Sequence, residues 1–150
     1  MDLSALVSPG AAASRSLVVT EELTVAHWVD GMPPVFGTPF LVYLMEVAAA
    51  DVLKPRLPEG WATVGAQVNV THLAATPLGM TVTATARLVS ATARTATFEV
   101  FAHDGTEKVG EGTHVRGLVN LARFESRWKA KAAAAGATRP GTLPSPGAHA

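Results

Sequence analysis

The strongest constraint on the fold of this chain is one helical pattern that is followed only by strand-like segments. Apolar residues recur at spacings of three and four after Pro39, and a first-turn position suits proline. Thr38 stands where an N-cap is expected, and Pro55 ends the pattern because proline disfavours helix at the residue before it. We therefore predict one helix over residues 39–53.

Strand patterns lie on both sides of this helix. They cover residues 16–25 before it and residues 61–74, 80–91, 94–103 and 108–123 after it. The pair Asp104-Gly105 is a hairpin signal between two of these segments. One helix cannot cover both faces of so long a sheet, so we expect a curved antiparallel sheet wrapped around it. The sequence thus predicts an α+β chain with the hot-dog fold.

The length of 150 residues suits a single folded domain, which we assign to residues 16–128. Residues 1–15 are predicted to form a flexible leader. Residues 129–150 hold Ala, Gly and Pro with almost no large apolar side chain, so burial cannot offset the entropy of ordering. We predict a disordered tail there.

Composition argues against several classes of function. With 12 basic and 12 acidic residues, the chain lacks the basic excess of a nucleic-acid-binding protein. The absence of cysteine removes disulfides and thiol nucleophiles, and five histidines without helical pairing predict no metal site. The sequence shows no signal peptide and no run of about 20 apolar residues. We expect a cytoplasmic protein, away from the membrane, that uses its own oxygen and nitrogen groups without a cofactor.

Glu46 is a charged residue in an otherwise apolar stretch of the predicted helix. A carboxylate in a helix at the centre of a curved sheet is costly to bury unless it is paired or hydrogen-bonded. Perturbed carboxylates cluster at active sites, which makes Glu46 a candidate catalytic residue. The alternative is a residue that points to solvent or lies at a dimer seam.

His72 is the second candidate. Strand alternation predicts that five residues share the apolar face of this strand: Val64, Ala66, Val68, Val70 and His72. That face should meet the helix, which would bring the histidine towards Glu46. A lone histidine on an apolar face is more often a core residue than a catalytic one, whereas a pairing with Glu46 would favour catalysis.

Thr38 and Arg116 also suit a site that binds a polar ligand. Thr38 either caps the helix or, beside the free N–H groups of the helix start, faces a developing oxyanion. Arg116 shares one face of the last strand with His114 and Gly112. It is either a solvated surface residue or a group with room to reach a ligand. The residues themselves leave both alternatives open.

Four segments carry recognisable motifs: residues 37–46, 70–79, 102–105 and 112–116. The block Val-Thr-His-x-Ala-Ala-Thr-Pro, which begins at Val70, is the most specific of them. In these motifs the chain resembles the fluoroacetyl-CoA thioesterase family, a branch of the hot-dog thioesterases. The resemblance extends in register over about residues 16–127.

This resemblance implies a homodimer that hydrolyses an acyl-CoA substrate at active sites on the subunit interface. It assigns catalysis to Thr38, Glu46 and His72. It assigns substrate binding to Gly65, Arg116, Met32 and Phe36. Glu46 would act as nucleophile or general base and His72 as the acid–base partner, with Thr38 orienting the reacting group.

Met32 departs from the family pattern. The fluoroacetyl-specific enzyme is expected to carry phenylalanine as a lid six residues before the catalytic threonine, and methionine lacks that rigid ring. We therefore expect another short or medium acyl-CoA to be the substrate. Two rival functions stay open: a hot-dog protein that binds acyl-CoA or a small ligand without hydrolysing it, and a hydratase or dehydratase.

Overall fold

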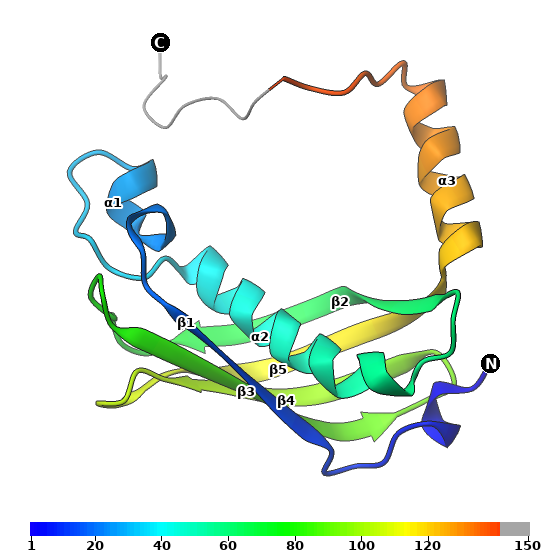
Figure 1. Ribbon diagram of the computed structural model, residues 1–150, viewed down its shortest axis with the longest axis horizontal. Coiled ribbons are helices and arrows are strands. Elements are labelled where there is room, and N and C mark those ends of the chain that lie inside the picture. Colours follow the sequence, from blue (N-terminus) through cyan, green and yellow to red (C-terminus); the bar gives the residue numbers. More distant parts are fainter. Residues whose placement is uncertain (142–150) are drawn as a thin grey trace.

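A sheet curled around one long helix forms the body of the protein (Figure 1). The computed structural model describes residues 1–141. Its five strands form one antiparallel sheet in the order β1-β3-β4-β5-β2. The strands are β1 Ala12–Val18, β2 Trp61–His72, β3 Thr81–Ala91, β4 Thr95–His103 and β5 Lys108–Asn120. This architecture confirms the predicted α+β hot-dog fold.

Helix α2 (Thr38–Leu53) lies inside the curve of the sheet. Its buried residues are Leu41, Leu44, Met45, Ala48, Ala49, Val52 and Leu53. The helix starts one residue before the predicted position, and Gly37 is its N-cap without any side-chain capping bond. The prediction that Thr38 is the N-cap is therefore wrong, because its hydroxyl bonds elsewhere. A 3-10 turn, η3 (Lys54–Arg56), follows the helix and contains Pro55.

The N-terminal segment is part of the folded body rather than a flexible leader. It forms a 3-10 turn, η1 (Leu3–Ala5), and β1 already begins at Ala12. Leu3 is completely buried and Val7 nearly so. The Leu3 N–H also donates to the Ala93 carbonyl at 3.1 Å. The leader predicted over residues 1–15 is corrected, because two apolar side chains in an Ala-rich segment are enough to close the end of the core.

Short helical turns replace the strand that was predicted to continue to residue 25. They are η2 (Glu21–Leu23) and α1 (Val25–Trp28). The Val25 N–H donates to the Val35 carbonyl and the Gly37 N–H donates to the Leu23 carbonyl, each at 2.9 Å. These bonds tie the turns to the start of α2.

β2 is an edge strand with a β-bulge. Its register against β5 shifts between Gly65 and Gln67, so the alternation of its side chains changes phase there. Ahead of the bulge Gly65 faces α2, since a Cβ at this position would lie 2.5 Å from the Glu46 carboxylate. Beyond the bulge His72 faces the start of α2 as predicted. Unbroken alternation had placed Gly65 on the opposite face.

The chain continues after the sheet as a helix that the sequence did not predict. The last strand ends at Asn120, whose side chain accepts a hydrogen bond from the Arg123 N–H at 3.1 Å and so caps α3 (Leu121–Ala134). The predicted tail boundary at residue 129 thus falls within a helix, and residues 142–150 of that tail lie outside the described residues. Within residues 1–141, no helix is long and apolar enough to cross a membrane.

Candidate active site

The catalytic candidates form two separate clusters within one chain. Thr38, at the start of α2, contacts His72 at the end of β2. Glu46, midway along α2, contacts Arg116 on β5. No hydrogen bond among residues 1–141 joins Glu46 to His72. Thr38 and Glu46 are eight positions apart, which separates them by about 12 Å along the helix axis.

The first cluster is a hydroxyl–imidazole pair. The Thr38 Oγ1 lies 2.8 Å from the His72 Nδ1. When the hydroxyl donates to Nδ1, the imidazole proton resides on Nε2. That Nε2 is buried and has no hydrogen-bond partner within residues 1–141. Burial also lowers the pKa of His72, which favours the neutral imidazole that a general base requires.

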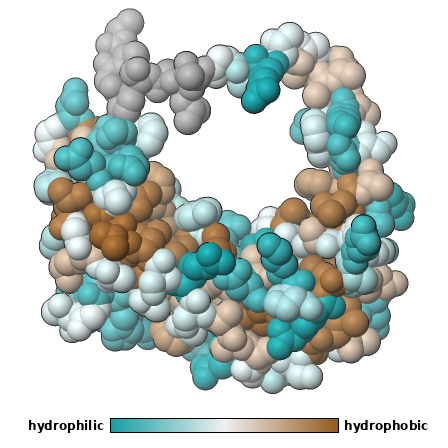
Figure 2. All heavy atoms as spheres, viewed as in Figure 1, coloured by the Kyte–Doolittle hydropathy of each residue, from teal (hydrophilic) through white to brown (hydrophobic). Residues whose placement is uncertain are grey.

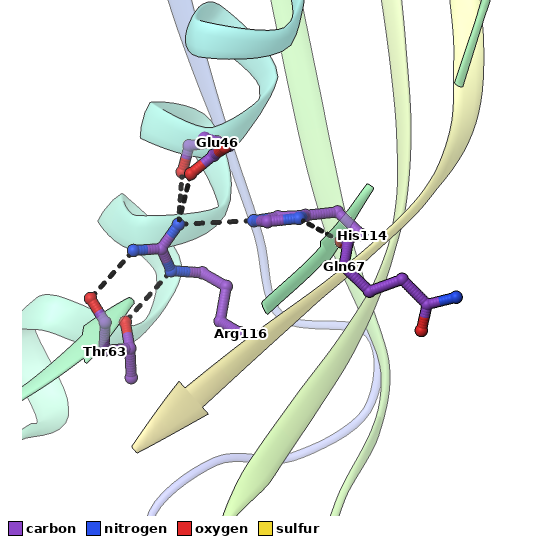
Figure 3. Close-up of polar contacts among 5 residues, drawn as sticks. All are labelled: Glu46, Thr63, Gln67, His114 and Arg116. Carbon is purple, nitrogen blue, oxygen red and sulfur yellow. Dashed lines mark hydrogen bonds and ion pairs between the residues drawn. The ribbon is translucent and has the colours of Figure 1, made fainter. Parts of the chain in front are cut away.

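The second cluster is organised by the buried guanidinium of Arg116 (Figure 3). Two of its nitrogens bond to Thr63: Nε donates to Oγ1 at 3.0 Å and Nη2 donates to the carbonyl at 2.8 Å. Its Nη1 faces Glu46, at 3.5 Å from Oε2 and 3.3 Å from the backbone carbonyl. Burial lowers the pKa of Arg116, and the nearby Glu46 charge opposes that effect. The group stays a cation at neutral pH.

His114 completes this cluster, and its role was not predicted from the sequence. It is 1% exposed, and its Nδ1 donates to the Gln67 carbonyl at 2.8 Å, because a carbonyl can only accept. The neutral Nε2 then accepts from the Arg116 Nη1 at 3.2 Å. Burial lowers the pKa of His114, and the Arg116 charge lowers it further. Its position two residues from Arg116, on the same strand face, is the one sequence signal that points to it.

Gly65 gives the Glu46 carboxylate its space. A Cβ added at Gly65 would lie 2.5 Å from Oε2, 3.0 Å from Cδ and 3.3 Å from Oε1 of Glu46. Any other residue would therefore displace the carboxylate from its present position. A glycine where another group approaches the strand closely is a recurrent feature of ligand sites.

The exposure of three predicted site residues, Glu46, Met32 and Phe36, bears on their predicted roles. The Glu46 side chain is 37% exposed and paired, so it is not the buried carboxylate that the apolar helix suggested. Met32 is 45% exposed in the loop after α1, an accessible position. Phe36 is 1% exposed within the hydrophobic core. A side chain that is packed on all sides does not contact a ligand directly, so we withdraw the substrate-binding role predicted for Phe36.

Comparisons with known proteins support the fold and identify the family. The family described as fluoroacetyl-CoA-specific thioesterase matches residues 19–122. The fluoroacetyl-CoA thioesterase of Streptantibioticus cattleyicolor is 43% identical over 124 residues, which cover 79% of this chain and 89% of that protein. A solved structure of the fluoroacetyl-CoA thioesterase has a TM-score of 0.79 at 37% identity, covering 83% of this chain and 97% of that one. A thioesterase-superfamily protein of Thermus thermophilus has a TM-score of 0.81 at 27% identity, covering 88% and 98%.

The family match spans most of the folded body, from the end of β1 to the start of α3. It therefore includes all of α2, the bulged strand β2 and the strand that carries His114 and Arg116. The matches include nearly the whole length of the two solved structures, so the likeness extends over a complete fold. The chain belongs to the fluoroacetyl-CoA-specific thioesterase family, whose members are thioester hydrolases.

Proposed function

We propose that this chain hydrolyses the thioester bond of a short or medium acyl-CoA and releases a free acid and CoA. The observation that carries this proposal is the Glu46 carboxylate, which lies against Gly65 with the Arg116 cation beside it. A carboxylate that is 37% exposed and held beside a cation can act as a nucleophile or a general base. In a chain of a thioesterase family, the group on which it would act is the thioester carbonyl.

We also propose that the working unit is a homodimer formed along β2. The strand pairs with β5 on one side only, and residues 65–69 are exposed. An uncovered strand edge is a template for pairing with another chain. A two-fold axis among these exposed residues would set two β2 strands antiparallel. His72 of one copy would then lie towards Gly65 of the second copy.

This dimer would unite the two polar clusters that one chain keeps apart. Thr38 and His72 of one copy would face Glu46, Gly65 and Arg116 of the other, and the two-fold axis would create two equivalent sites. The Thr38–His72 hydrogen bond is exposed in the single chain, where such a neighbour can reach it. The distance of about 12 Å between Thr38 and Glu46 in one helix then presents no obstacle.

The chemistry follows from these groups. Glu46 attacks the carbonyl or takes a proton from the attacking water, a C–O bond forms and the C–S bond breaks. In the direct route the proton taken from the water passes to the leaving thiolate through His72; in the acyl-enzyme route the thiolate takes its proton from solvent, and His72 accepts one from the water that hydrolyses the intermediate. Thr38 orients the reacting oxygen. The N–H of Gly65 or the N-terminus of α2 stabilises the oxyanion. Both a direct hydrolysis and an acyl-enzyme route are compatible with this set.

Met32 bears on the choice of acyl group. Solved forms of the similar thioesterase are substituted at a threonine and at a phenylalanine six positions before it, the spacing of Thr38 and Met32 here. A flexible thioether in place of a rigid ring should discriminate poorly between acyl groups of similar size. We therefore propose that the substrate is another short or medium acyl-CoA and that the chain is not selective for fluoroacetyl-CoA.

The test is release of free thiol from a panel of acyl-CoAs, measured for the parent chain and for Thr38→Ala and Glu46→Ala. Both variants should lose most activity. Mixing the two inactive variants under subunit exchange should restore part of it, because a mixed dimer contains one complete site. Binding of acyl-CoA without thiol release would favour the non-catalytic alternative. The cytoplasmic location stays a prediction of the sequence.

A further inference from the structure

We infer that α3 of one copy packs against the lid segment of a second copy, and so closes the active site from the partner's side. The lid segment is defined as residues 21–32, which comprise η2, α1 and the turn after it. The inference rests on the proposed homodimer along β2. It names a second interface, one that the strand pairing does not include.

The first observation is an uncovered apolar stripe on α3. Leu121, Phe124 and Trp128 follow one another at spacings of three and four, so they share one face of the helix. They are 46%, 42% and 51% exposed. Three large apolar side chains in a row on one helix face usually mark an interaction site.

The second observation is a matching apolar surface on the lid segment. Trp28, Val29 and Met32 are 42%, 51% and 45% exposed. Figure 2 shows apolar surface at the end of the molecule that carries α1 and again at the foot of α3, with a hollow between the two. Neither surface reaches the other within one chain, since α1 and α3 stand at opposite ends of the molecule (Figure 1).

The register of β2 brings the two surfaces together in the dimer. The lid segment adjoins the His72 end of β2, because Thr38 contacts His72 there. Helix α3 adjoins the other end, where Trp61 pairs with Asn120 and the Leu121 N–H donates to the Gly60 carbonyl. Antiparallel pairing of two β2 strands sets these opposite ends side by side. At about 21 Å, α3 is several times longer than the strand spacing of about 4.8 Å, so it reaches over the neighbouring copy.

Charge complementarity selects the same pair of surfaces. Helix α3 carries Arg123, Arg127, Lys129 and Lys131 against one acidic residue, Glu125. Lys129 pairs with Glu125, and the other three cations have no ion-pair partner within residues 1–141. The lid segment carries Glu21, Glu22 and Asp30 and contains no Lys or Arg. A basic helix with an apolar face therefore meets an acidic segment with an apolar face.

The contact acts on the site because the lid segment is bonded to the start of α2. The Gly37 N–H donates to the Leu23 carbonyl at 2.9 Å, directly before Thr38. A partner helix that clamps residues 21–32 therefore also fixes the position of the Thr38 hydroxyl and of Met32. In this role α3 positions the lid and does not touch the reacting atoms.

Single cysteines test the contact directly, since the natural chain has none. Chains with Val29→Cys and chains with Trp128→Cys, distinguished by mass tags, are mixed under subunit exchange and treated with a short bismaleimide. Most of the product should be a covalent pair of unlike chains. The control pairs Trp128→Cys with Val89→Cys, an equally exposed residue on β3, and should stay uncoupled.

Light scattering on the same samples separates the possible failures. Uncoupled chains in a dimeric protein would overturn the contact between α3 and the lid segment and leave the proposed dimer intact. A monomeric protein would overturn the dimer itself. Hydrolysis by Trp128→Ser gives a readout without thiol chemistry: KM should rise several-fold while the dimer mass holds. A KM equal to that of Val89→Ser would contradict the role of α3 at the lid.

Discussion

Replacing Gly65 by alanine should separate activity from stability more sharply than any other single change. The new Cβ would stand 2.5 Å from the Glu46 Oε2. An ordinary contact between such atoms is about 3.5 Å, so the carboxylate must move by about 1 Å. It can do so because Glu46 has a flexible side chain that is 37% exposed. The movement disturbs the contact with the Arg116 Nη1, which is 3.5 Å from Oε2 in the structure.

The expected cost falls on catalysis. A displacement of about 1 Å at a reacting group can reduce turnover about 100-fold. The cost to folding should stay within about 1 kcal/mol, because alanine in place of glycine also lowers the entropy of the unfolded chain. Thiol release under saturating acyl-CoA measures the first quantity, and urea unfolding of the same preparation measures the second.

Two glycine substitutions on β5 serve as controls. A Cβ at Gly117 would meet nothing within 4 Å, so Gly117→Ala should leave both activity and stability unchanged. A Cβ at Gly110 would lie 2.8 Å from Leu41 and 3.1 Å from Met45, so Gly110→Ala should destabilise the core. Full activity in Gly65→Ala would show that the position of the Glu46 carboxylate does not limit the reaction, and would refute its role as base or nucleophile.

Three further results are expected. Glu46→Ala and His72→Ala should each remove most hydrolysis, and the double variant should be little worse, because members of one catalytic set are non-additive; two small additive losses in thiol release would indicate packing roles. His114→Gln should unfold at a lower urea concentration than the parent at pH 8. This difference should shrink as the pH falls below 6.5, because the lowered pKa of His114 means that protonation favours the unfolded parent chain. A difference that does not change with pH would contradict a neutral buried imidazole. Met32→Phe should widen the ratio of kcat/KM between fluoroacetyl-CoA and acetyl-CoA, whereas the parent should discriminate by about 1 to 3 kcal/mol at most; a strong preference in the parent would refute the altered lid.

The sequence was informative wherever local periodicity decides the outcome. The helix pattern placed α2 to within a residue and singled out Glu46 as a charge among apolar neighbours. Alternation placed His72 on the face that meets the helix, and the structure joins it to Thr38. The structure does not join His72 to Glu46. That contact depends on the distance along the helix axis, which strand alternation does not predict.

The misses share a physical cause, which is that they depend on contacts between distant segments. Leu3 and Val7 are buried because the sheet and α2 leave an end open, and nothing local to an Ala-rich segment signals this. The cap that begins α3 was hidden because Asn120 ends a strand whose apolar pattern continues into the helix. The sequence indicated His114 only as a neighbour of Arg116, because its hydrogen bond to the Gln67 carbonyl joins two strands that are far apart in the sequence.

The bulge in β2 connects these observations, because it lies between Gly65 and Gln67, two residues that the site uses. It turns Gly65 towards α2, where the missing side chain makes room for the Glu46 carboxylate. Directly after the bulge, the Gln67 carbonyl accepts the His114 Nδ1–H. That bond fixes the His114 tautomer, so that Nε2 can accept from Arg116, whose remaining donors hold Thr63 and Glu46. A strand with unbroken alternation from His72 would turn a side chain into the space of the carboxylate, so the irregular backbone is itself a feature that positions Glu46.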